Sequence, residues 1–216
     1  MNFWTQTRRL VLMIVVVLFL TGPAQAAIVS QLNIQEIQIA LDVTGGDIVG
    51  GSTQGGTILS GVFQPPSPPI MPDFNGLGSD SNQYTFSLFT NTGPDGFPAP
   101  SAMVDAGLDT ITVDLRSLFT QVTGPGSGLI PGGSAFLRIG HDSETVTGTY
   151  DSGTGNFEVT WMILFHPDTD FLQGGQVTID GTAGVAPVPV PASALLFGTG
   201  IASLAGVLWK KKTVKP

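Results

Sequence analysis

Short runs of alternating apolar residues, separated by glycine and proline, fill residues 27–191 and argue against a helical fold. The whole chain of 216 residues contains 29 Gly and 16 Pro, and this part of it shows no amphipathic helix of ordinary length. The clearest alternation runs from Leu32 to Leu41, with a phase slip at Glu36 that predicts a β-bulge. This pattern is typical of half-buried strands joined by tight turns.

Further strand-like runs recur along the chain, and turn residues separate them. They cover residues 57–63, 84–90, 110–115, 135–139, 145–150, 157–164 and 176–182. A hairpin is predicted between Thr145 and Trp161, while residues 45–56 and 64–78, rich in Gly and Pro, are predicted surface loops. The sequence therefore predicts an all-β fold, a single β-sandwich or jelly-roll-like domain over residues 27–184.

The N-terminus has the pattern of a secretory signal peptide over residues 1–26. Two arginines precede an unbroken apolar run over residues 10–20, and Ala24 and Ala26 form the small-x-small pattern that signal peptidase accepts. Cleavage is expected before Ala27. An uncleaved signal anchor and a twin-arginine export signal are the alternatives.

The C-terminus contains a second membrane signal. A proline-rich linker over residues 185–191 leads into residues 192–209, which carry no charge. As a helix, this segment would span roughly 27 Å, which is just enough for a minimal transmembrane helix. Residues 210–216 form a basic cytoplasmic tail, in which Lys210, Lys211 and Lys212 stop transfer across the membrane. The domain before this helix is therefore expected on the exported side.

Setting both signals aside changes the charge of the middle part. Only Arg116 and Arg138 remain there against all 16 carboxylates of the chain, a net charge of about −14. A domain without lysine cannot neutralise a phosphate backbone, so nucleic-acid binding is excluded. The chain also has no cysteine, which excludes thiol catalysis, cysteine metal sites and a lipoprotein anchor.

One Gly-rich segment carries oxygen ligands of the type that calcium prefers. Asp73, Asn75 and Asp80 lie at close spacing, although the segment lacks the pattern of an EF-hand loop. Asp, Asn and Gly are also the residues that β-turns require. No cofactor is expected, and calcium at these three residues stays open.

No catalytic motif stands out. The chain contains neither a Gly-x-Ser-x-Gly elbow nor a phosphate-binding loop with lysine, and its two histidines, His141 and His166, lack the spacing of a helical zinc pair. A glycosidase would need two acids flanking a sugar and an aromatic platform, for which Trp161, Tyr84 and Tyr150 are the Trp and Tyr candidates. We therefore expect no enzyme and assign no catalytic residue.

The C-terminal segment resembles the PEP-CTERM sorting domain of Gram-negative bacteria. Val188, Pro189, Val190 and Pro191 stand where that family has its motif, and an apolar segment with Leu-Leu-Phe-Gly-Thr-Gly and a basic cluster follow. Val190 replaces the glutamate of the family name. The Gly-Thr-Tyr-Asp-Ser-Gly hairpin is also similar to passages in other proteins of this system.

The resemblance implies recognition by an exosortase-type membrane protease after export. The protein would pass through an inner-membrane-anchored intermediate to the cell envelope, the outer surface or an exopolysaccharide matrix. The expected function is that of a structural surface or matrix protein. Two alternatives remain open, a calcium- or glycan-binding adhesive module held permanently by its helix, and an envelope hydrolase.

Overall fold

A computed structural model describes residues 26–164 and 172–185. The chain divides into two compact units, residues 1–186 and 187–216, and every described residue belongs to the first. The sorting motif, the C-terminal apolar segment, the lysine tail and all of the predicted signal peptide except its last residue lie outside the described residues. Among the described residues, no helix is long and apolar enough to span a membrane.

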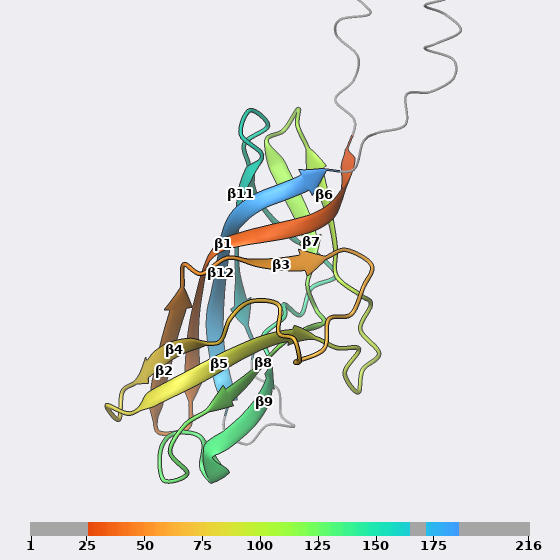
Figure 1. Cartoon of the computed structure of the whole chain (residues 1–216). Helices are drawn as coiled ribbons and strands as arrows, with labels where there is room; N and C mark the ends of the chain where they lie inside the picture. The colour runs from red at the N-terminus through yellow and green to blue at the C-terminus, as the bar shows by residue number, and fades with distance from the viewer. Residues whose placement is uncertain (1–25, 165–171, 186–216) are drawn as a thin grey trace, which may run out of the picture. The chain divides into compact units, whose positions relative to one another are not determined.

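Twelve strands and one short 3-10 helix make up the described part (Figure 1). The strands are β1 (Ala27–Val43), β2 (Gly46–Ser52), β3 (Gly56–Leu59), β4 (Phe74–Gly78), β5 (Gln83–Thr90), β6 (Ser101–Asp105), β7 (Thr110–Asp114), β8 (Leu118–Thr123), β9 (Ser134–Arg138), β10 (Val146–Tyr150), β11 (Asn156–Ile163) and β12 (Leu172–Val185), and the 3-10 helix is η1 (Pro131–Gly133). The prediction of an all-β fold is confirmed.

Six of the strands, including the long strand β1, close into a barrel. One edge of β1 pairs with β12 over nearly its whole length, and the first residues of its other edge pair with β6. The ring then continues through β7, β10 and β11 back to β12, with every pairing antiparallel. Closing a sheet in this way satisfies the backbone hydrogen bonds of what would otherwise be edge strands.

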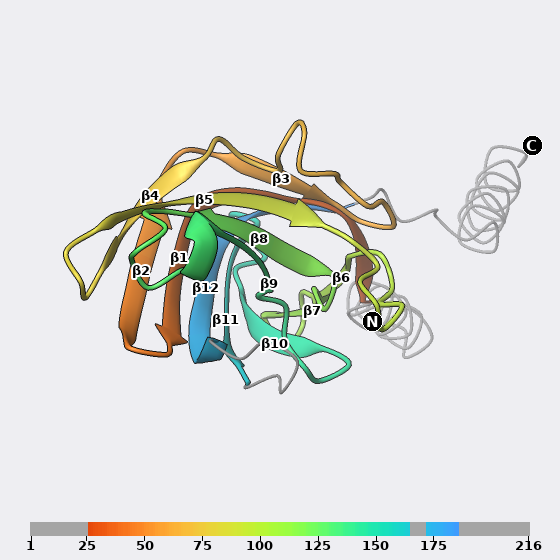
Figure 2. The ribbon, with the colours of Figure 1, turned by 90° about the horizontal axis from the view of Figure 1, so that it is seen from below.

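A second arm of the same sheet branches from β1 beyond its contact with β6. Further along the edge that pairs with β6, β1 pairs first with β3 and then with β2. From β2 the arm continues through β4, β5 and β8 to β9. Seen from below, β5 and β8 lie on one side and β2, β1, β12 and β11 on the other (Figure 2). The sheet thus wraps around a single apolar core.

The predicted sandwich or jelly roll differs from this arrangement, because all twelve strands belong to one hydrogen-bonded sheet. The physical reason is the length of β1 and β12, which have 17 and 14 residues and pass through both halves of the domain. Register shifts bend this pair, one of them between Ile34 and Glu36. The bulge predicted at Glu36 is therefore confirmed.

The predicted hairpin is also confirmed, since β10 pairs with β11 across a turn at residues 151–155. The two predicted loops are wrong in part, because residues 45–56 contain β2 and residues 64–78 contain β4. Glycine in these strands serves packing: a Cβ on Gly50 or Gly76 would lie 2.7 or 2.6 Å from the Phe86 ring. Glycine lets this buried ring lie flat against both strands.

Candidate functional site

The three predicted calcium ligands do not converge in the structure. Asp73 precedes β4, Asn75 lies within it, and Asp80 follows it in the turn to β5. The five residues of β4 separate the backbones of Asp73 and Asp80 by roughly 16 Å. Among the described residues, no three acidic or histidine side chains are grouped so that they could hold a metal ion. A cation at these residues would therefore not be shared by both aspartates.

Asp80 instead organises the turn between β4 and β5. Its carboxylate accepts hydrogen bonds from the Tyr84 hydroxyl at 2.8 Å, from the Asn82 amide at 2.7 Å and from the backbone N–H of Leu129 at 3.3 Å. Desolvation alone would raise the pKa of Asp80, but the bonds from Tyr84 and Asn82 outweigh it and lower this pKa. These contacts give Asp80 a structural role.

The remaining chemical candidates are distributed through the core. His141 is buried and lies edge-on to Trp161, while His166 falls outside the described residues. The exposed fractions of Tyr84, Tyr150 and Trp161 are only 0, 8 and 5%. The three Trp and Tyr side chains considered for a sugar platform therefore belong to the core, and none forms a surface platform.

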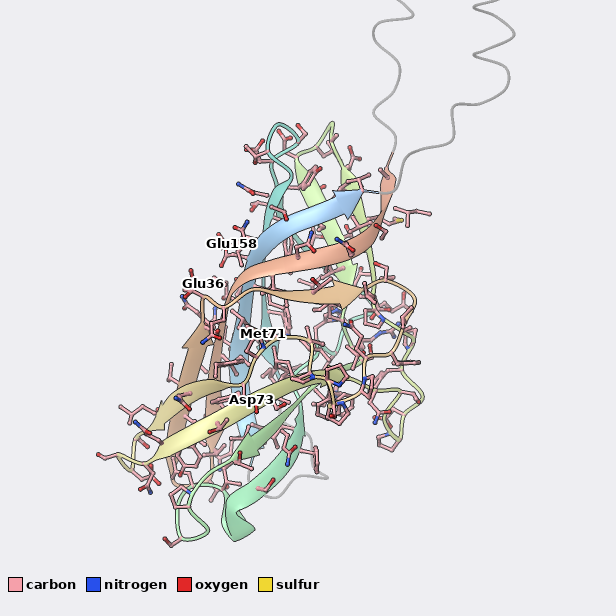
Figure 3. The ribbon with its side chains drawn as sticks, viewed as in Figure 1. Glu36, Met71, Asp73 and Glu158 are labelled. Atoms are coloured by element: carbon pink, nitrogen blue, oxygen red, sulfur yellow. The ribbon has the colours of Figure 1, made fainter. Side chains whose placement is uncertain are left out.

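The most organised set of polar side chains lies on the outer face of β11, β12 and β1. Glu158 is directly opposite Asp180, which is directly opposite Glu36, so three carboxylates form one row across three strands. Glu158 and Glu36 lie on the same side of the sheet in Figure 3. Partial burial raises the pKa of Asp180, and the charges of Glu158 and Glu36 raise it further. We call this set the acidic row.

A row of uncharged polar side chains runs parallel to the acidic row. On β11, β12 and β1 the two rows are two residues apart. Its members are Thr160, Thr178, Gln38, Asn75 and Thr85, from β11, β12, β1, β4 and β5 in that order, and Gly51 of β2 leaves a gap between Gln38 and Asn75. The register between β2 and β4 pairs Gly50 with Gly76, which places Gly51 and Asn75 in line. The two threonine hydroxyls of β11 and β12 are 2.9 Å apart. We call this set the amide–hydroxyl row.

An apolar row lies on the other side of the amide–hydroxyl row from the acidic row, again two residues away along each strand. It contains Met162, Ala40, Val49 and Leu77, interrupted by Gln176. Met162, Val49 and Leu77 have exposed fractions of 60, 55 and 59%. Rows of this kind are about 7 Å apart, since each strand rises roughly 3.3 Å per residue.

A shallow groove lies where these rows cross β1, β2 and β4. Its volume is about 680 Å³, and its lining includes Glu36, Gln38, Gly51, Asn75 and Leu77. Gly51 contributes no side chain, so the floor dips between Gln38 and Asn75. A second hollow of about 640 Å³ continues over β12 and β11 along Met162 and Gly175. The outer face therefore offers a track graded from acidic through neutral to apolar.

This arrangement is suited to binding an extended polar molecule. The amides and hydroxyls can both donate and accept hydrogen bonds, and the carboxylates attract cations. In the sequence, Glu36 stands out only as a phase slip, and nothing singles out Glu158 or Asp180. The alternation of each strand marks these positions as outward-facing, but only the register aligns them in rows.

Comparison with protein-family models, curated proteins and solved structures finds no match to this chain.

Proposed function

We propose that this protein is an exported, non-catalytic structural component of the cell surface or extracellular matrix, delivered by its C-terminal sorting signal. The observation that carries the proposal is the order of the tail. Val188-Pro189-Val190-Pro191 is followed by an uncharged segment and then by Lys210, Lys211 and Lys212. An exosortase-type protease and signal peptidase are its proposed processing partners.

The structure adds support from the character of the β domain. Its single apolar core contains no disulfide, and six of its strands close into a barrel, which removes their free edges. Such a domain suits a protein that must persist outside the cell. The acidic surface favours solubility once the protein leaves the membrane.

A glycan-binding adhesive module is the second candidate function, because the graded outer face offers a surface for a long polar ligand. In this role the protein would link matrix polymer to the envelope. The two candidates differ in whether the domain remains anchored, which fractionation can measure.

Fractionation of cells with and without an exosortase tests the proposal. The protein is expected in the matrix or medium when the enzyme is present and in the membrane fraction when it is absent. A variant carrying both Pro189→Ala and Pro191→Ala should stay in the membrane in both hosts. Equal membrane retention of the unaltered protein in both hosts would contradict sorting and favour the permanent anchor.

A further inference from the structure

We infer that the outer face of the sheet binds a polysaccharide bearing free amino groups, laid across the strands along the amide–hydroxyl row. The inference rests on the proposed matrix function and deepens it, because it names the chemical class of the matrix polymer. It follows from three features of the face: the spacing of its rows, their hydrogen-bonding groups and their charge.

The spacing suits a polymer of sugars. Neighbouring strands lie roughly 4.8 Å apart, and five of the six strands in the amide–hydroxyl row present a side chain at multiples of this interval, with a gap at Gly51 of β2. The sugar repeat of an extended β-linked glycan is similar in length. A chain laid perpendicular to the strands would therefore bring successive sugars over successive strands, and affinity would grow with chain length.

The hydrogen-bonding groups and the apolar row match the two surfaces of a sugar ring. Gln38 and Asn75 each carry an amide that can donate and accept, as sugar hydroxyls require, and both are exposed. The dip at Gly51 gives a ring room between them. Val49 and Leu77 lie alongside and offer contact to the C–H face of the ring.

Charge complementarity selects the kind of glycan. The acidic row lies on one side of the amide–hydroxyl row. On its other side, beyond the apolar row, Asp42 and Asp47 lie opposite each other on β1 and β2. Both arginines of the described part pair with carboxylates elsewhere, Arg116 with Asp114 at 2.7 Å and Arg138 with Asp142. An anionic polymer would be repelled, while the ammonium groups of an amino sugar would relieve the crowding of like charges in the acidic row.

Binding can be measured with the full-length protein, purified in a mild detergent, by fluorescence polarisation. Three labelled probes of equal length serve as ligands: a hexamer of glucosamine, a hexamer of N-acetylglucosamine and a hexamer of galacturonate. We expect the glucosamine hexamer to bind at least tenfold more tightly than the acetylated one, and the galacturonate hexamer not to bind. Added salt should weaken binding of the glucosamine hexamer, and a glucosamine dimer should bind far more weakly than the hexamer.

Two double variants and one control locate the site. Glu36→Gln with Asp180→Asn should weaken binding of the glucosamine hexamer at least tenfold. The same double variant should stay folded, because it removes like-charge repulsion. Gln38→Ala with Asn75→Ala should weaken binding of both the glucosamine and the acetylated hexamers. Asp95→Asn makes the same kind of charge change at an exposed turn between β5 and β6, outside the lining of both hollows, and should leave binding unchanged. Thermal unfolding of each variant confirms that it is folded.

Several results would overturn the inference. They are no binding of the glucosamine hexamer at millimolar concentration, equal binding of the acetylated or acidic hexamer, cleavage of a probe, or unchanged affinity in folded double variants. If the protein reaches the matrix in the fractionation experiment but fails these binding tests, only the proposed ligand is refuted. If it binds the glucosamine hexamer but remains in the membrane, the proposed sorting is refuted.

Discussion

At the scale of single residues, two hydrogen bonds tie the ionisation of His141 to the fold. Its Nε2 accepts a hydrogen bond from the backbone N–H of Leu115 at 2.9 Å, and its Nδ1 donates to the carbonyl of Ser143 at 2.8 Å. This pair of bonds requires the neutral ring. Burial lowers the pKa of His141, and the charges of Arg116 and Arg138 act in the same direction.

The lowered pKa predicts a loss of stability in mild acid. The Ser143 carbonyl and Asp114 favour the charged ring, but they do not reverse the shift. Below pH 6.5 the unfolded chain therefore binds a proton that the folded protein resists, so the free energy of unfolding falls as the pH drops. Above pH 6.5 both states are neutral at this residue, and its contribution becomes constant.

The measurement is denaturant unfolding between pH 7.5 and 5 in a His166→Asn background, which leaves one imidazole in the chain. Replacing His141 with Asn as well should cost about 1–3 kcal/mol at pH 7.5, because buried backbone partners lose their bonds. The same replacement should flatten the pH dependence below 6.5. An unchanged slope would assign the acid sensitivity to other groups.

At the scale of elements, the contact of Phe86 with β2 and β4 sets the packing of the second arm. Phe86 stacks on Phe74 with ring centroids 5.3 Å apart, and its other contacts include Gly50 and Gly76. We expect Gly76→Ala to destabilise the domain by about 1–3 kcal/mol, because the new Cβ would overlap the buried Phe86 ring.

Gly126→Ala is the matched control for this substitution. Its Cβ would meet nothing closer than 3.8 Å, and the backbone at Gly126 has no positive φ. Chemical denaturation of both variants compares them directly. Equal stability of the two would mean that the Phe86 contact does not require glycine.

The same contact explains which elements could be predicted from the sequence. β5, β7, β10 and β11 alternate clearly and lie close to their predicted positions. β2 and β4 were predicted as loops because their glycines resemble turn residues. Only the position of Phe86 in the folded sheet shows that these glycines face a ring. The sequence does not predict β6 and β8 as strands.

At the scale of the whole molecule, the pairing of β1 with β12 joins the two ends of the described domain. Val29 lies opposite Val185, so the strand that follows the predicted signal peptide begins beside the start of the linker. Local alternation cannot reveal this pairing, because it joins residues that are between 129 (Val43 and Leu172) and 156 (Val29 and Val185) positions apart. For the same reason the sequence alone could not align the acidic, amide–hydroxyl and apolar rows.

In the proposed function, both ends of the chain are removed and the β domain is the mature product. Mass spectrometry of the protein recovered from a host with an exosortase can test this processing. We expect an N-terminus at Ala27 and the loss of the segment from residue 192 to Pro216, with that segment retained when the enzyme is absent. Recovery of an intact Lys210–Pro216 tail in both hosts would refute the proposed processing.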